Sequence, residues 1–245
     1  MRYEIKGESL PYLVCYLNNG QSIICEGGAM SWMTPNIEMN TGTNGGVGKV
    51  FSRMFSGESL FQNIYTAKSD NGLIGFASSF PGKILPIEVA PGRDVICQKK
   101  SFLAGTENLE LSIHFRKKIG VGIFGGEGFI MQKISGNGTV FIEIDGSAQE
   151  YYLQAGQKLL VSTGHLVMMD ATCSIDVETI KGLKNVFLGG QGLFNTVITG
   201  PGKVVLQSMP ISKTANTLAV YLPIDSDGNS TIEAVAGIAK IIGKK

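Results

Sequence analysis

The sequence predicts an all-β protein built from three repeated β units. Three observations predict this fold class: two short blocks each recur three times, apolar residues alternate with a period of two in several segments, and 33 of the 245 residues are glycine. One unit of about 65 residues would bury its apolar face poorly on its own. We therefore expect the units to close around a pseudo-threefold axis, with an open row of three as the alternative.

The first repeated block begins with a glycine and continues into three apolar residues. It reads GQSIICE from Gly20, GRDVICQ from Gly92 and GQKLLVS from Gly156. Apolar residues at three consecutive positions are typical of a strand covered on both faces. Val161 stands in the third copy where the others have Cys25 and Cys97, which favours a packing role for these cysteines. Cys15 and Cys173 are interpreted in the same way, as buried small hydrophobes.

The second block places one polar residue beside its glycine. It reads GESLF from Gly57, GEGFI from Gly126 and GQGLF from Gly190. A turn containing glycine follows in every unit, at 68–72, 135–139 and 199–203. A turn of this kind between apolar runs predicts a β-hairpin.

A period-two pattern follows each of these turns. The inward positions that it predicts are Ile74 and Phe76, Val140 and Ile142, and Val204 and Leu206. The residues between them are mixed in character. The pattern therefore predicts the core face of a half-buried strand in every unit.

These patterns divide the chain into a repeat region and a tail. The units occupy about 1–84, 85–148 and 149–210 of a single domain at 1–223. The tail at 224–245 is predicted to hold a loop and a short C-terminal helix, with Ser230 or Thr231 as its N-cap.

The predicted tail helix covers 232–242 and is apolar on most faces. We expect it to pack on the β core or on a neighbouring subunit. Binding to a membrane surface is the alternative, although only three lysines supply charge for it.

Charge and composition exclude several function classes. The net charge of +1 creates no overall field that would recruit nucleic acid or an anionic membrane. No stretch is long and apolar enough to span a bilayer, and the first twenty residues lack the pattern of a secretory signal. We expect a cytoplasmic protein. Its mean hydropathy of +0.15 with only 17% charged residues predicts a homo-oligomer.

Several motifs resemble catalytic or cofactor sites but lack the context that those sites require. Residues 120–125 match GxGxxG, yet strand-like sequence follows where a dinucleotide site needs a helix. Residues 45–49 resemble part of a phosphate loop, but Val50 stands where a magnesium ligand is required. His114 and His165 occupy different places in their units. We therefore predict no catalytic residues, no cofactor and no metal site.

The candidate polar site consists of Glu58, Glu127 and Gln191, one residue beside each glycine of the second block. If the units close around an axis, these side chains could converge on it and bind a cation or a polar ligand. Alternatively, each caps its own turn by accepting hydrogen bonds from backbone N–H groups. The capping role is favoured because it explains why glutamine can replace glutamate.

Five segments in order carry a resemblance to a known family. They are residues 27–33 (GGAMSWM), the glycine-rich insert at 42–48, 56–61 (SGESLF), 80–82 (FPG) and 101–104 (SFLA). Together they resemble the family named for altered inheritance of mitochondria, over about residues 1–222. The resemblance implies three copies of a double-stranded β-helix type of fold, similar to the tryptophan-responsive RNA-binding attenuation protein, and no enzymatic activity.

The family's eukaryotic members are linked to the organisation of the mitochondrial inner membrane. This sequence has no Arg-rich presequence and suits a bacterial, cytoplasmic member.

The functional expectation is a non-catalytic β scaffold that binds another macromolecule, such as a protein partner, or assembles with itself. RNA binding is the first alternative, and binding of a small polar ligand or a cation is the second. RNA binding would require basic residues repeated across the units. The basic pair Lys99-Lys100 aligns with Thr163-Gly164 and with Gly27-Gly28, so nucleic acid is not the expected partner. Peripheral membrane contact through the tail helix remains an alternative.

Overall fold

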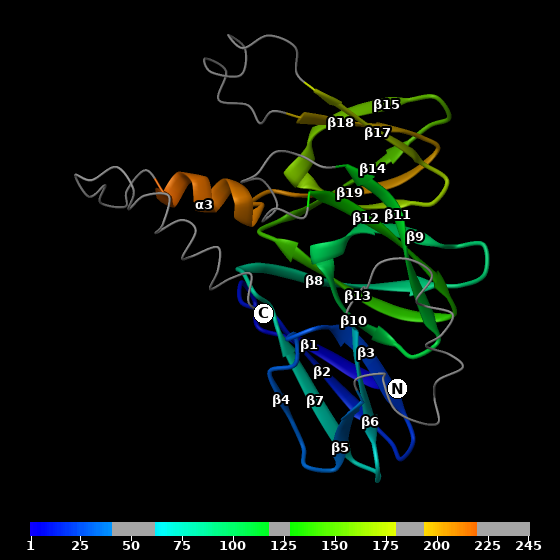
Figure 1. Ribbon diagram of the computed structural model, residues 1–245, viewed down its shortest axis with the longest axis vertical. Helices are drawn as coiled ribbons and strands as arrows, with labels where there is room; N and C mark the ends of the chain where they lie inside the picture. The colour runs from blue at the N-terminus through cyan, green and yellow to red at the C-terminus, as the bar shows by residue number, and fades with distance from the viewer. Residues whose placement is uncertain (41–61, 118–127, 180–193, 220–245) are drawn as a thin grey trace.

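The computed structural model describes residues 1–40, 62–117, 128–179 and 194–219, and most of these residues lie in β-strands (Figure 1). One short α-helix, α3 (Ile211–Ala219), lies near the C-terminal end of this part of the chain. The all-β class is therefore confirmed. The segment 232–242, for which the sequence predicts a helix, lies outside the described residues.

The strands form four sheets of antiparallel pairs. The first sheet has the order β1 (Arg2–Lys6), β2 (Tyr12–Leu17), β7 (Gly72–Ala77), β4 (Trp32–Met33). The second sheet has the order β5 (Ile37–Asn40), β6 (Gln62–Ala67), β3 (Ser22–Glu26), β10 (Phe102–Thr106), β13 (Gly138–Asp145), β8 (Gly82–Val89).

The remaining strands form the third and fourth sheets. The third sheet has the order β11 (Leu109–Lys117), β12 (Phe129–Gly136), β9 (Val95–Gln98), β16 (Leu166–Asp170), β19 (Gly202–Gln207), β14 (Ala148–Leu153). The fourth sheet has the order β15 (Lys158–Ser162), β18 (Phe194–Thr199), β17 (Ser174–Thr179).

The strand orders of the sheets are related by a constant offset of six strands. Adding six to each strand number of the second sheet gives the order of the third sheet. The same offset relates the order β2-β7-β4 of the first sheet to β8-β13-β10 of the second, and β9-β12-β11 of the third to β15-β18-β17 of the fourth. Three repeated units would produce this pattern. The unit boundaries and the superposition of the units stay predictions.

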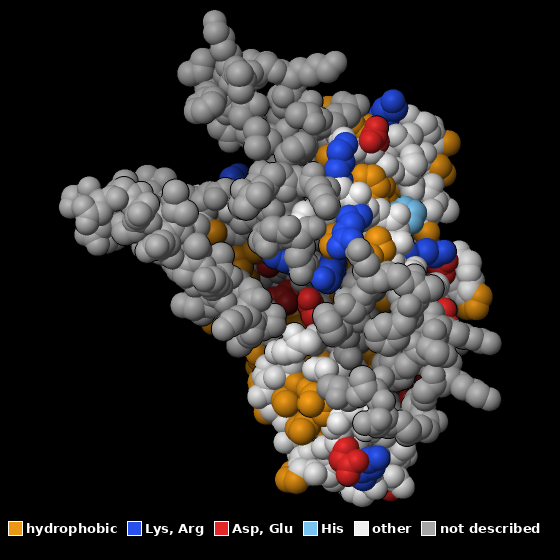
Figure 2. All heavy atoms as spheres, viewed as in Figure 1, with side chains coloured by type: hydrophobic (Ala, Val, Ile, Leu, Met, Phe, Trp, Pro, Cys, Tyr) orange, Lys and Arg blue, Asp and Glu red, His pale blue; other side chains and the backbone are white. Residues whose placement is uncertain are grey.

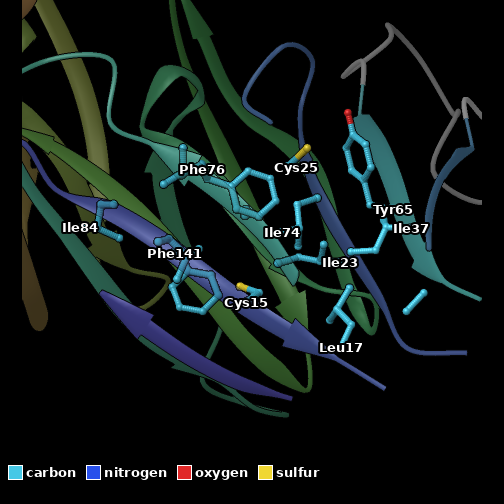
Figure 3. Close-up of a cluster of buried hydrophobic side chains, with 14 residues drawn as sticks. Cys15, Leu17, Ile23, Cys25, Ile37, Tyr65, Ile74, Phe76, Ile84 and Phe141 are labelled. Atoms are coloured by element: carbon cyan, nitrogen blue, oxygen red, sulfur yellow. The ribbon is translucent and has the colours of Figure 1, made fainter. Parts of the chain in front are cut away.

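Three hydrophobic clusters lie between the four sheets. The first cluster separates the first and second sheets and includes Cys15, Phe76 and Phe141 (Figure 3). The second cluster separates the second and third sheets, and the third cluster separates the third and fourth. The sheets therefore stack along the long axis of the molecule, with β4 to β7 near one end and β15, β17 and β18 at the other (Figure 1).

The glycines of the first block have a common conformational reason. Gly20, Gly92 and Gly156 have φ values of 80°, 79° and 75°, in the left-handed region that side chains other than glycine rarely adopt. Each glycine lies in the turn that precedes its apolar triplet, where a Cβ would meet no atom within 4 Å. The backbone conformation of the turn, and not close packing, therefore favours glycine here.

One side-chain hydrogen bond recurs in all three predicted units. The Thr34 Oγ1 accepts the Leu73 N–H at 2.9 Å, and the Thr106 Oγ1 accepts the Thr139 N–H at 3.2 Å. In the third unit, the Asp170 Oδ2 accepts the Lys203 N–H at 2.8 Å. The acceptor residue directly follows β4 in the first unit and is the last residue of β10 or β16 in the other two. The donor residue directly precedes Ile74, Val140 or Val204, and these three are fully buried as predicted.

The predicted β-hairpins are wrong. The turns at 68–72, 135–139 and 199–203 connect β6 to β7, β12 to β13 and β18 to β19, and in each case the two strands belong to different sheets. The chain thus crosses a hydrophobic cluster at each turn instead of reversing within a sheet. A glycine-rich turn between apolar runs has the same sequence pattern in both situations.

Two burial predictions need correction. Strands β13 and β19 are covered on both faces and not half-buried, because Phe141 and Val205 are fully buried. Conversely, the triplet Leu159-Leu160-Val161 is covered on one face only, since Leu160 is 64% exposed. Its strand belongs to the fourth sheet, at the end of the stack, whereas the other two triplets lie in the internal sheets.

The expected closure around a pseudo-threefold axis is not what the described strands form. Closure would require pairing between the first and last units, yet β4 pairs only with β7 and β15 only with β18 among the described strands. Both strands are sheet edges. Adjacent sheets stack face to face and leave two separate ends, as an open row of units would, while the threefold repeat itself stays a prediction.

Candidate functional site

The predicted polar trio of Glu58, Glu127 and Gln191 lies outside the described residues. The same holds for the GxGxxG segment at 120–125 and the phosphate-loop-like segment at 45–49. The convergence of the trio on one site therefore stays a prediction.

A buried carboxyl group that the sequence analysis missed lies at the end of β13. The Glu143 Oε1 accepts the Ser78 hydroxyl at 2.7 Å and the Ser79 backbone N–H at 2.5 Å. These serines follow β7 of the first sheet, whereas Glu143 belongs to the second. Glu143 therefore joins two layers of the stack. An acidic residue inside the apolar segment Val140–Asp145 is the sequence pattern that could have revealed it.

A glutamine makes the corresponding contact one layer further along. The Gln207 Oε1 accepts the Asp145 N–H at 3.0 Å, and its Nε2 donates to the Gly164 carbonyl at 2.9 Å. The Gln207 carbonyl lies 2.7 Å from the Nδ1 atom of His165. Glu143 and Gln207 directly follow Ile142 and Leu206, which pair with the first residues of β10 and β16. The same contact between neighbouring sheets is thus made by the carboxyl group of Glu143 in one place and by the amide of Gln207 in the next.

Asp145 connects the Gln207 contact to α3. Its Oδ2 accepts the N–H of Ile211 at 3.0 Å, and its own carbonyl accepts the N–H of Met209 at 3.1 Å. The first N–H groups of a helix have no partner within the helix. Asp145 supplies one from a distant strand and so fixes the start of α3 against the stack.

Burial is the main influence on both carboxyl groups. It raises the pKa of Glu143 above its usual value, while the hydrogen bonds from Ser78 and Ser79 lower it by less. Burial also raises the pKa of Asp145, against the Ile211 N–H and the charge of Lys100. A carboxyl group with a raised pKa can hold a proton, but the hydrogen bonds of Glu143 and Asp145 all connect segments of this fold. We assign both residues a structural role.

We expect Glu143→Gln to change how stability depends on pH. A raised pKa in the folded state contributes stability that is complete below the usual value of about 4.5 and is lost as pH rises through the folded pKa. Glutamine does not titrate and can make the contacts that Gln207 makes. The melting temperature of the variant, measured by circular dichroism, should therefore rise relative to that of the unmodified chain between pH 4.5 and pH 7.

The control is Glu143→Ala, which removes the acceptor for Ser78 and Ser79. It should lower stability by about 1–3 kcal/mol at both pH values, the range for leaving a buried donor unpaired. A difference between Glu143→Gln and the unmodified chain that is the same at both pH values would contradict the raised pKa.

The four cysteines are buried free thiols, as predicted. Burial raises the pKa of Cys15, Cys25 and Cys97 to about 12, and it raises the pKa of Cys173 as well. A thiol reacts as a nucleophile only in its thiolate form. These cysteines are therefore packing residues. The Gln132 Nε2 lies 3.6 Å from the Cys97 sulfur and 3.4 Å from the Lys99 carbonyl, so this buried amide is partnered.

The two histidines do not belong to one site. His165 lies in a 3₁₀ turn (Thr163–His165), and its ring contacts the Gln207 carbonyl. His114 lies on β11, where burial and the neighbouring Lys133 lower its pKa. Within residues 1–40, 62–117, 128–179 and 194–219, no group of three or more His, Cys, Asp and Glu side chains could hold a metal ion.

Exposed apolar residues lie at the two ends of the stack. On β4, Trp32 is 41% and Met33 37% exposed, and on β15, Leu160 is 64% exposed. The indole of Trp32 covers Gly75 and contacts the Tyr12 ring edge to face, with centroids 5.5 Å apart. Hydrophobic side chains gather on the surface over β4 and β7 (Figure 2). These are surfaces on which another chain could pack, and the sequence analysis did not identify them.

Among the helices of the described residues, none is long and apolar enough to cross a bilayer.

Comparison with known proteins identifies relatives along almost the entire chain. A crystal structure of a Streptococcus pyogenes protein is similar to this fold, with a TM-score of 0.73 and 26% identity over 90% of this chain and 99% of that one. An uncharacterised protein of Streptococcus pyogenes serotype M6 is 30% identical over 93% of each chain. The family model described as "Mitochondrial biogenesis AIM24" matches residues 3–209. The chain belongs to the mitochondrial biogenesis AIM24 family, as the resemblance of its motifs indicated.

Proposed function

We propose that this protein is a non-catalytic β scaffold that acts by binding another macromolecule or by assembling with itself. The observation that carries the proposal is the exposure of Trp32, Met33 and Leu160 on the end sheets of a stack in which the central strands of the interior sheets are covered on both faces. Exposed apolar groups on sheet edges favour contact with another polypeptide.

The buried polar groups support the same proposal. Glu143, Gln207 and Asp145 each bond to another sheet, a turn or the helix. The free, buried thiols also suit a cytoplasmic protein, in which cysteines stay reduced. The hydrogen bonds between sheets suit a rigid body that presents surfaces.

The test is light scattering on the purified chain over a range of concentrations, combined with native mass spectrometry. The proposal expects a mass that is a multiple of 26.1 kDa, or a single chain that copurifies with a macromolecular partner. A monomer that carries a stoichiometric metal ion or metabolite would contradict it and favour the alternative of a small-ligand or cation site.

RNA binding remains an alternative that the same preparation can test. Lys and Arg side chains lie over β11 and β12 (Figure 2), but Lys133 pairs with Asp94 at 2.7 Å and the Lys117 ammonium donates to the Val177 carbonyl. The expected result is no retention of single-stranded RNA at micromolar protein, even at low salt. Retention that weakens as salt increases would favour RNA binding over the scaffold proposal.

A further inference from the structure

Two sheet edges lie at opposite ends of the stack. β4 is an edge of the first sheet and β15 an edge of the fourth, and each pairs with one strand among the described residues. An edge strand has one side free of ladder hydrogen bonds and can pair with a strand of another chain.

The two edge strands correspond to the two strands of each internal junction, a name we give to the pairs β3–β10 and β9–β16. Within the second sheet, β3 pairs antiparallel with β10, and within the third sheet, β9 pairs antiparallel with β16. By the six-strand offset, β15 corresponds to β3 and β9, whereas β4 corresponds to β10 and β16. The ends of one chain thus carry complementary halves of a further junction of the same kind.

Side-chain burial differs between the internal junctions and the two edges. The triplets Ile23–Cys25 on β3 and Val95–Cys97 on β9 are buried at every position, as are Ala104 on β10 and Met168 on β16. Their counterparts at the edges include exposed Leu160 on β15 and exposed Trp32 and Met33 on β4. The edges therefore expose apolar side chains at positions that pairing would cover.

We propose that a second copy of this chain completes the junction, with β15 of one copy pairing antiparallel with β4 of the next. This inference rests on the proposed scaffold function and names its partner and its surface. The joined sheet would have the order β17-β18-β15 followed by β4-β7-β2-β1, which repeats the order of the internal sheets and adds β1.

The internal junctions fix the register. Cys25 lies opposite Ala104, and Cys97 lies opposite Met168. Val161 has the place of these two cysteines in its triplet. Trp32 corresponds to Ala104 and Met168 at the internal junctions. Trp32 pairs with Gly75 of β7, just as Ala104 pairs with Phe141 of β13 and Met168 pairs with Val205 of β19.

Val161 therefore lies opposite Trp32 of the next copy, and Leu160 lies opposite Met33. The short length of β4 is no obstacle, since each internal junction consists of only three residue pairs. Because the two edges differ, the contact is head to tail, and its repetition produces a ring or a filament.

The first test places a charge in the junction. Leu160→Lys and Met33→Lys, each made in the full chain, should reduce the mass measured by light scattering to that of one 26.1 kDa chain. The matched control is Leu10→Lys, because Leu10 is also exposed, at 70%, but lies outside both edges. It should leave the assembly unchanged. Circular dichroism melting should show that all three variants remain folded, since the altered side chains are exposed within one chain.

The second test is position-specific and does not depend on loss of assembly. Leu160→Cys chains mixed with Met33→Cys chains should form a disulfide-linked pair on mild oxidation, because directly opposite residues bring their Cβ atoms within reach of a disulfide. Either variant alone should form none, and Leu10→Cys mixed with Leu160→Cys should form none. The native thiols are buried and do not compete.

The outcomes separate this inference from the scaffold function. An oligomer that survives both lysine variants and gives no cross-link would overturn the β15–β4 junction and leave self-assembly through another surface. An unmodified chain that is monomeric at every concentration would also overturn the junction, and the scaffold would then require a different macromolecule as partner.

Discussion

Phe141→Ala should lower the free energy of unfolding by about 3–5 kcal/mol, the range for removing a buried phenylalanine. Phe141 is fully buried on β13 and extends from the second sheet into the first hydrophobic cluster (Figure 3). Its ring also contacts Tyr3 of β1 edge to face, with centroids 4.8 Å apart. Truncation would leave a cavity between two sheets that cannot collapse without moving both. Urea denaturation followed by circular dichroism measures the change.

Two control variants accompany this prediction. Phe141→Leu retains most of the volume and should lose clearly less stability than Phe141→Ala, because the cavity is smaller. Tyr152→Ala, at an exposed position on β14, should change the free energy of unfolding by no more than about 0.5 kcal/mol. If Phe141→Ala behaved like Tyr152→Ala, the assignment of Phe141 to the first cluster would be wrong.

Gly82→Ala should lower stability by about 3 kcal/mol or more, because the added methyl group collides with backbone that has no room to move. A Cβ at Gly82 would lie 1.7 Å from the Ile144 carbonyl oxygen and 2.9 Å from the Gly146 nitrogen. Gly82 begins β8, pairs with Asp145 and donates its N–H to the Ser9 carbonyl at 2.9 Å. Relief of the collision would break this pairing. Thermal melting of the purified variant measures the loss.

Gly105→Ala is the matched control for this substitution. A Cβ at Gly105 would meet Leu109 Cδ1 at 2.8 Å, but this atom is the end of a side chain that can rotate away. We expect a loss nearer 1 kcal/mol, at the low end of the cost of overpacking. Equal losses for the two variants would show that the backbone around Gly82 can shift, contrary to the tight β8–β13 pairing.

Local sequence patterns predicted those features of the fold that local geometry determines. Gly20, Gly92 and Gly156 recur because each turn requires a positive φ value. The apolar positions Ile74, Val140 and Val204 were correctly predicted to be buried. Thiol burial was also predictable, since Val161 replaces a cysteine in one unit and remains buried. In each case the physical cause lies within a few residues of the pattern.

The arrangement of these segments was not predictable in the same way. The period of two shows which residues share a face, but not whether the opposite face meets water or another sheet, so the burial of Phe141 and the exposure of Leu160 were both missed. The helix α3 was missed because its stabilising contact with Asp145 comes from a distant strand. Glu143 was missed for the same reason, since its partners Ser78 and Ser79 belong to another layer.

The cysteines are distributed so that each of the three hydrophobic clusters contains at least one. Cys15 and Cys25 lie in the first cluster, Cys97 in the second and Cys173 in the third. A thiol-specific reagent can modify each sulfur only after the surrounding layer has opened, because burial suppresses the reactive thiolate. The order in which the four sulfurs become labelled over time would therefore record whether the stack opens from one end, from the middle or all at once.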